Sequence, residues 1–168
     1  MNIYTMLENM VLFLDTVGFY GPWIAAICII VALLKRPVFV VLYVVFFWLN
    51  QLLNQLLKLT FREERPSNPI PFSQRERYKG AHFYGMPSGH AESVGFSFVF
   101  LLLLEGYRSW WVYIIGAIAM VTCIQRWKYR RHTIEQIIAG LFFGGTFAWI
   151  VLYVFDDYRI LRVKKWIQ

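Results

Sequence analysis

The chain has 168 residues, a formal net charge of +7, 58% hydrophobic residues and only 16% charged residues. An ordinary soluble domain has about 45–50% apolar and about 25% charged residues. Here the excess of apolar residues falls in long runs, which excludes an ordinary soluble domain and indicates a chain with a bilayer as its solvent. One domain, covering residues 1–168, is the expectation for this length.

The positive charge is clustered in residues 58–79, 126–131 and 159–165, between or after the apolar runs. A net positive charge favours binding to nucleic acid, to anionic lipid headgroups or to a phosphate-bearing substrate. No nucleic-acid motif accompanies these clusters, so we expect a membrane surface and a phosphorylated substrate as partners, and no nucleic acid. Cys28 and Cys123 lie inside apolar runs and show no metal or disulfide spacing.

The first apolar segment, residues 4–17, carries Glu8 and Asp15. It could be a short first span or a helix lying at the membrane interface. Residues 18–22 contain two glycines and a proline, which predict a break in the chain. Residues 23–34 are then strongly apolar and form the next expected membrane helix.

Four further apolar segments follow, at residues 38–57, 91–104, 110–124 and 133–155. The pattern therefore predicts an all-α integral membrane bundle of five to six transmembrane helices. Gly140, Gly144 and Gly145 in the last segment are expected to permit close helix approach.

The order of the crossings predicts which loops share a side of the membrane. The loop at residues 58–90 and the connection at residues 126–132 are separated by two crossings, so both lie on one side. Residues 35–37, Arg108 and the C-terminal tail lie on the other.

Three clusters of polar residues lie on that first side. In the first, Lys58, Arg62 and Arg65 have the spacing i, i+4, i+7 that places them on one stripe of a helix. Pro66 predicts that the helix ends there. The alternative is an ordinary basic helix end at a membrane surface, where the helix dipole favours cations.

The second cluster is Ser88, Gly89 and His90, just before an apolar helix. Ser88 is a natural N-cap, Gly89 permits close backbone approach, and the helix N-terminus can bind an anion. His90 stands where a proton donor to a departing oxygen is needed. The alternative is an ordinary capped helix with an interfacial histidine.

The third cluster places Arg126 at the end of one helix and His132 at the start of the next. Glu135 and Gln136 share a helix face with His132. Either could accept a hydrogen bond from Nδ1–H, which would leave Nε2 as a nucleophile.

Together the clusters predict a phosphate site. Lys58, Arg65 and Arg126 would clamp phosphate oxygens, with Ser88 and the amides near Gly89 completing the cradle. The two histidines would act as nucleophile and acid. No set of carboxylates and histidines suggests a metal, so we expect neither a metal nor a cofactor.

The three clusters resemble the signature motifs of the type 2 phosphatidic acid phosphatase superfamily, written here as Lys58-x6-Arg65-Pro66, Pro87-Ser88-Gly89-His90 and Arg126-x5-His132. The resemblance implies a six-helix membrane fold and a metal-independent lipid phosphatase. It implies that His132 forms a phosphohistidine and that His90 protonates the leaving oxygen. The remaining motif residues would bind the phosphoryl group.

The chain departs from the family pattern at two positions. Gln125 stands where the family usually has Ser, and Gln136 stands where it usually has Asp. The His-Thr-x-x-Gln pattern and the Tyr-Gly-Met-Pro-Ser run resemble the dolichyl-diphosphate phosphatase branch, which implies a lumenal or extracytoplasmic site. That branch usually has Ser where Gly89 stands.

Polyprenyl diphosphate, phosphatidic acid and phosphatidylglycerol phosphate all remain possible substrates. Residues 75–79 could bind a second phosphate or form a solvated basic loop. The alternatives to a phosphatase are a catalytically silent lipid-binding relative, a phospholipid phosphotransferase using the same site, and a small channel or structural membrane protein.

Overall fold

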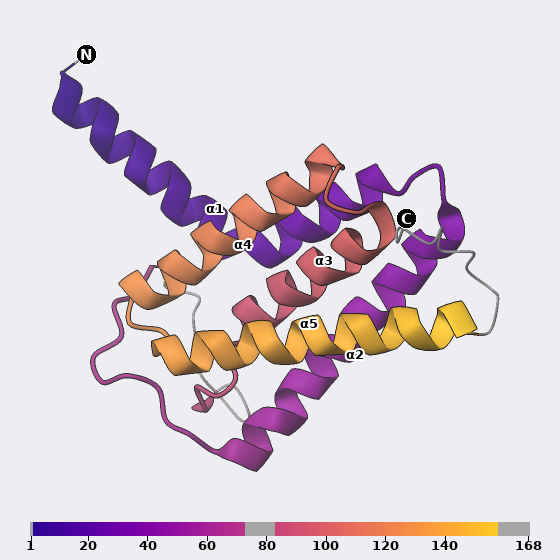
Figure 1. The fold of residues 1–168 in the computed structure, drawn as a ribbon. Helices are drawn as coiled ribbons and strands as arrows, with labels where there is room; N and C mark the ends of the chain where they lie inside the picture. Colours follow the sequence, from indigo (N-terminus) through magenta and orange to yellow (C-terminus); the bar gives the residue numbers. More distant parts are fainter. Residues whose placement is uncertain (1, 73–82, 158–168) are drawn as a thin grey trace.

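A computed structural model of the chain describes residues 2–72 and 83–157, and the described residues form five α-helices and no β-strand (Figure 1). The helices are α1 (Ile3–Ala32), α2 (Pro37–Phe61), α3 (Gly89–Glu105), α4 (Trp110–Lys128) and α5 (Ile134–Asp157). By length and composition α1, α2 and the Ile134–Phe155 part of α5 can each cross a membrane. The expected all-helical membrane fold is confirmed.

The shortest helix, α3, lies at the centre of the bundle. It has 17 residues and contacts all four other helices, and Figure 1 shows it between α4 and α5. Its buried residues lie on every side of the helix, as expected for a helix enclosed by others. Because α3 begins at Gly89, this central helix carries the second polar cluster on its first turn.

The expected break at residues 18–22 is wrong, because α1 continues through them as one helix of 30 residues. A Cβ added to Gly18 would lie 2.5 Å from Gln125 Cβ, and one added to Gly21 would collide with Thr122 Oγ1. The glycines therefore let the α1 backbone approach α4 closely. The two expected N-terminal segments merge into one helix, so the described residues form five helices, the lower number of the expected five to six.

The acidic side chain in the middle of α1 has a structural role. Asp15 is buried, and its Oδ2 accepts hydrogen bonds from Lys128 Nζ at 2.6 Å and Tyr129 Oη at 2.8 Å. These contacts attach α1 to the C-terminal end of α4. The residues before Asp15, which form the N-terminal half of α1, project away from the other helices, and their side chains are exposed (Figure 1).

Glycines bring α3 and α5 into close contact, as the sequence predicts. A Cβ on Gly140 would lie 2.5 Å from the Ser88 carbonyl oxygen, and one on Gly144 would collide with the Glu92 carbonyl oxygen. Gly95 of α3 faces the backbone of Leu141 in the same way. The two backbones therefore touch along their length, which small residues permit in membranes.

The C-terminal end of α2 differs from the expectation. The helix ends at Phe61, where Arg62 adopts a left-handed conformation with φ of 50° and donates its backbone N–H to the Lys58 carbonyl. The predicted helical stripe of Lys58, Arg62 and Arg65 is therefore wrong, because only Lys58 is helical. Arg62 is exposed and bonds Leu59 O.

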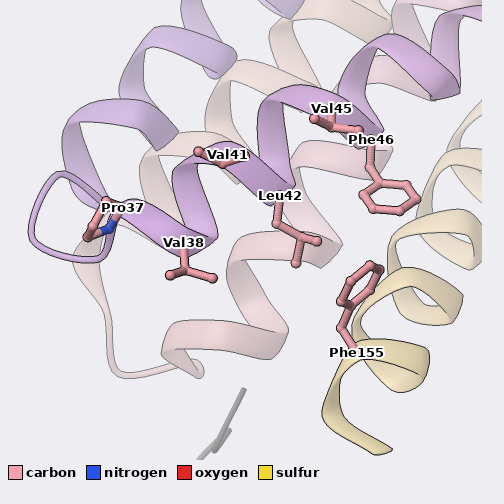
Figure 2. A pocket seen from close by; sticks show the side chains of 7 residues that line it. All are labelled: Pro37, Val38, Val41, Leu42, Val45, Phe46 and Phe155. Atoms are coloured by element: carbon pink, nitrogen blue, oxygen red, sulfur yellow. The ribbon is translucent and has the colours of Figure 1, made fainter. Parts of the chain in front are cut away.

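The two ends of the bundle differ in chemistry. The ends of α2 and α4 and the starts of α3 and α5 meet at one end, as the order of crossings predicts. The opposite end carries an Arg36–Glu105 ion pair at 2.8 Å. Near it, a groove of about 610 Å³ runs between α2 and α5 (Figure 2). The groove is lined only by apolar side chains: Pro37, Val38, Val41, Leu42, Val45, Phe46 and Phe155.

Candidate active site

The first and third polar clusters are in direct contact at one end of the bundle. Arg65 lies in the loop after α2, and its Nη1 donates to the Arg131 carbonyl at 3.0 Å. The same nitrogen lies 3.1 Å from His132 Nε2. Lys58, on the last turn of α2, donates from Nζ to the Tyr84 carbonyl at 2.9 Å, which connects it to the segment before the second cluster.

Two of the expected phosphate-binding cations are buried. Lys58 is 2% exposed and Arg126 is 3% exposed. Arg126 lies in the last turn of α4, where its Nε donates to Gln125 Oε1 at 2.7 Å. Charges this deep are costly without hydrogen-bonding or anionic partners. Gln125, at the position of the usual Ser, therefore serves as a partner of the Arg126 guanidinium.

The second cluster forms a narrow turn before α3. Ser88 is fully buried, and its backbone N–H donates to the Gln136 carbonyl at 2.9 Å. Ser88 is the N-cap residue of α3, as expected, but its side chain makes no capping hydrogen bond. Within the described residues its Oγ has no partner, which leaves a buried hydroxyl able to bond a ligand.

Gly89 stands close to a polar side chain of α2. A Cβ added to Gly89 would lie 2.9 Å from Asn54 Oδ1. Asn54 Nδ2 donates to the Pro87 carbonyl at 3.3 Å and to Glu92 Oε2 at 2.6 Å. Asn54 thus stabilises the turn before α3. It also occupies the space that a serine side chain, usual in the related branch, would need at position 89.

His90, the expected acid, is held by a helix outside the three motifs. Its Nε2 lies 3.2 Å from the Phe19 carbonyl oxygen of α1. The Phe19 ring centroid also lies 5.3 Å from the Arg126 guanidinium carbon, a cation–π distance. Sequence reasoning missed Phe19, because one phenylalanine in an apolar run carries no signal.

His132, the expected nucleophile, is 3% exposed and has a defined tautomer. Its Nδ1 lies 2.9 Å from the Gly85 carbonyl and 3.2 Å from Gln136 Oε1. Both partners are acceptors, so Nδ1 carries the proton and the Nε2 lone pair faces Arg65. Burial, reinforced by the positive charges of Arg65 and Lys58, holds the pKa of His132 well below its usual range.

The Gln136 side chain is fixed by four hydrogen bonds. Its Oε1 accepts from Thr133 N, and its backbone N–H donates to Thr133 Oγ1, both at 3.3 Å, which is the reciprocal capping box of a helix start. Its Nε2 donates to Glu63 Oε1 at 2.7 Å and to the Glu64 carbonyl at 2.8 Å. Because both partners of Nε2 are acceptors, the amide must direct Oε1 towards His132. The contact of Oε1 with His132 Nδ1 is the fourth hydrogen bond of the side chain.

Of the two residues expected to orient His132, the geometry favours Gln136. Glu135 is exposed on the first turn of α5, and neither hydrogen bond of His132 Nδ1 involves it. Glu135 instead lines a pocket of about 410 Å³ that opens at His132. The other lining residues are Pro66, Ser67, Trp127, Arg130, Thr133 and Ile134.

Sequence reasoning also missed Glu63 and the Gly85 carbonyl. The Thr-x-x-Gln capping signal was visible in the sequence, but the partner of the Gln136 amide lies 73 residues away. Residues 75–79, considered for a second phosphate, lie outside the described residues. In the part of the chain that the structure describes, no group of three His, Cys, Asp or Glu side chains is placed to hold a metal ion.

Comparison with known proteins assigns the family. The PAP2 superfamily model matches residues 39–160. A dolichyldiphosphatase from Saccharomyces cerevisiae is 25% identical over 128 residues, which cover 70% of this chain and 52% of the yeast protein. This chain therefore spans about half the length of that relative.

The fold also matches a solved structure, a transmembrane PAP2-type phosphatidylglycerolphosphate phosphatase from Bacillus subtilis. The TM-score is 0.56 at 18% identity, and the match covers 90% of this chain and 87% of that chain. Together with the apolar helices, this likeness identifies an integral membrane protein. The chain belongs to the PAP2 superfamily.

Proposed function

We propose that this protein is a metal-independent lipid phosphatase that works through a phosphohistidine on His132. The observation that carries the proposal is the state of His132: Nδ1–H is held by two acceptors, and Nε2 faces Arg65 where a pocket opens. A neutral imidazole with a directed Nε2 lone pair is a competent nucleophile. The family and the names of the two relatives support a phosphatase.

In the first step, His132 Nε2 attacks phosphorus and the bond from phosphorus to the lipid oxygen breaks. His90 gives its proton to that oxygen, which leaves as an alcohol or as a lipid monophosphate. Lys58, Arg65 and Arg126 stabilise the charge on the equatorial oxygens, and Ser88 Oγ and the Gly89 amide bond the same group.

In the second step, water attacks the phosphohistidine. His90, now neutral, accepts a proton from the water, and the bond from phosphorus to Nε2 breaks. Phosphate leaves, and His132 returns to its neutral form with the proton still on Nδ1. The Gln136 and Gly85 oxygens hold the ring in one orientation throughout the cycle.

We infer that the substrate is a polyprenyl diphosphate or a glycerophospholipid phosphate such as phosphatidic acid. The pocket at His132 has exposed Trp127 and Ile134 in its lining, next to the apolar surface of the bundle. A substrate with a phosphate head and a long apolar tail suits this arrangement, since the head reaches Nε2 while the tail stays in the bilayer.

We also infer that the site faces the extracytoplasmic or lumenal side. The support is the resemblance to the dolichyl-diphosphate phosphatase branch, because basic residues lie at both ends of the bundle and the positive-inside rule does not choose between them. The test is labelling of Ser67→Cys with a membrane-impermeant maleimide in sealed vesicles whose cytoplasmic face points outwards, in a Cys28→Ser and Cys123→Ser background. Labelling only after permeabilisation supports this orientation, and labelling of the sealed vesicles contradicts it.

The function itself is tested by phosphate release from purified protein in detergent with a chelator present. Polyprenyl diphosphate, phosphatidic acid and phosphatidylglycerol phosphate are offered in parallel, with His132→Ala as the control. Release that depends on His132 supports the proposal and ranks the substrates. Release that a chelator abolishes and a divalent ion restores contradicts the metal-free mechanism.

The same assay separates the rival functions. Phosphate transferred to an added alcohol, with little free phosphate, indicates a phosphotransferase. Lipid binding without turnover indicates a catalytically silent relative. Lipid phosphates that neither bind nor react indicate a channel or structural protein.

A further inference from the structure

We propose that Glu63 supplies negative charge to His132 through the side-chain amide of Gln136, so that the three side chains form an amide-bridged triad. The proposal rests on the proposed function, in which His132 is the nucleophile. Glu63 and Gln136 are positioning residues in this scheme, because neither touches the phosphate.

The contacts that carry the proposal form an unbroken chain. Glu63 Oε1 accepts from Gln136 Nε2 at 2.7 Å, and Gln136 Oε1 lies 3.2 Å from His132 Nδ1. Gln136 is fully buried, whereas Glu63 is exposed, so the amide lies between His132 and a carboxylate at the edge of the site. The backbone reinforces the same junction, because the Gly85 N–H donates to the Glu63 carbonyl at 2.7 Å while the Gly85 carbonyl lies 2.9 Å from His132 Nδ1.

An amide can transmit the effect of a carboxylate. When the NH₂ group donates to an anion, the amide becomes more polarised and its carbonyl becomes a stronger acceptor, because hydrogen bonds in a chain reinforce one another. A stronger acceptor at Nδ1 stabilises positive charge on the ring. That charge develops on His132 as Nε2 bonds to phosphorus.

The local surroundings explain why this position holds an amide instead of the usual carboxylate. The end of the side chain at 136 faces Glu63 Oε1 and the Glu64 carbonyl oxygen, which are both acceptors. A carboxylate there would face two acceptors with no proton to donate. An amide satisfies both of them and still directs an oxygen towards His132.

The charge balance at His132 gives Glu63 a role. The charged and titratable groups that act on the ring are Lys58 of α2, Arg65 of the following loop, His90 of α3 and Arg126 of α4. Each of them opposes a positive charge on the ring. Glu63 is the acidic side chain bonded to the amide that orients the ring, so it opposes their effect.

An isosteric charge exchange tests the triad. E63Q should lower kcat by about tenfold, in the range of supporting residues one bond away from a reacting group. Q136E should cost more, since two carboxylates then face each other. The double variant E63Q/Q136E restores one carboxylate and one amide in contact, and should be faster than either single variant.

Glu64→Gln is the matched control, because it neutralises the neighbouring carboxyl group and keeps the Glu64 backbone carbonyl that Gln136 uses. Its loss of kcat should be much smaller than that of E63Q. E63Q should also shift the acid limb of the kcat/KM profile to lower pH, since removing a negative charge disfavours the imidazolium. A loss of packing alone would lower the rate without moving the limb.

Two results overturn the triad: equal losses in E63Q and E64Q, or a double variant no faster than Q136E. If wild-type protein shows no turnover that depends on His132, the proposed function fails instead. The triad is then tested by ¹⁵N NMR of the histidines, where E63Q should lower the pKa of His132 and E64Q should not. An unchanged His132 pKa in E63Q would contradict the triad whatever the activity.

Discussion

The two histidines of the site are held in very different ways. His132 has Gly85 and Gln136 at one ring nitrogen and Arg65 at the other, all from segments inside the residues that match the family. Among the described residues His90 has one hydrogen bond, to the Phe19 carbonyl of α1, a helix that precedes the matched residues.

In the proposed mechanism, this difference corresponds to two requirements of one reaction. A nucleophile must approach phosphorus along one direction, so a fully determined ring is an advantage. An acid must first protonate the leaving oxygen and then accept a proton from water, so a single, exchangeable bond suits it. The protein fixes His132 with its core motifs and leaves the orientation of His90 to α1.

The largest effect is expected for His132→Ala. Removal of the nucleophile should lower kcat by about 10³-fold or more, as for other residues that act as a unit in covalent catalysis. The loss should be the same for substrates with good and poor leaving groups. Phosphate release is the measurement, and near wild-type turnover would contradict the role of His132.

His90→Asn should cost about 10²- to 10⁴-fold with a lipid substrate, the usual range for general acid–base catalysis. The deficit should shrink with a p-nitrophenyl phosphate ester, because that leaving group departs without a proton. The measurement is the single-turnover release of the leaving group from the two substrates, because the second step is common to both. An equal deficit in that first step would contradict the role of His90 as the acid.

Gly85→Ala is expected to disturb the orientation of the His132 ring without changing a residue proposed to bind phosphate. A Cβ there would lie 2.5 Å from Gln136 Oε1, so the amide must move and the ring loses its orientation. A displacement of this kind should cost up to about 10²-fold in kcat. Gly145→Ala, with its Cβ 3.1 Å from Val99 Cγ2, is the control and should cost far less.

Phe19→Leu should weaken the His90 side of the site only slightly. It removes the ring beneath Arg126 and keeps the backbone carbonyl, so the loss is that of one cation–π contact, about 0.5–1 kcal/mol or a two- to fivefold rise in KM. Phe13→Leu, an exposed position on the same helix, is the control. An equal rise in both variants would remove Phe19 from the site.

The smallest effect on kcat/KM from protonation of His132 is expected when the pH is lowered from neutrality towards about 6.5. Protonation of Nε2 would remove the nucleophile, and the pKa of His132 is held well below its usual range by burial and by Arg65. His132 therefore stays neutral until the pH falls well below about 6.5, the ordinary histidine value. The acid limb of the kcat/KM profile, which reports the protonation of His132, should therefore lie well below that value, and an acid limb at or above it would contradict the assignment.

Much of this arrangement could be predicted from the sequence. Apolar runs predict the helices, and the order of crossings predicts that Lys58, His90 and His132 share one end. Gly140 and Gly144 predict the contact between α3 and α5. These features depend on local residue patterns and on whether the number of crossings between two loops is odd or even, and both can be read from a single sequence.

Other features depend on contacts that no local pattern encodes. Glycines and a proline at residues 18–22 indicate a break or a close approach equally well, and Thr122 on α4 decides between them. Arg65 leaves the helical stripe because Arg62 ends α2 early. The Glu63 carboxylate contacts Gln136 only once both loops are folded. The sequence therefore shows that Gln136 replaces the usual Asp, but it does not show which carboxylate lies beside the amide.

The glycine contact between α3 and α5 has a consequence for the distance between the two histidines. His90 lies on the first turn of α3, and His132 lies two residues before α5 begins. Because Gly140 and Gly144 press one backbone against the other, the two rings are spaced by main-chain contact instead of by adjustable side chains. A single methyl group added at Gly144 would therefore force α3 and α5 apart and change the distance between the two histidines, although it lies outside the proposed phosphate site.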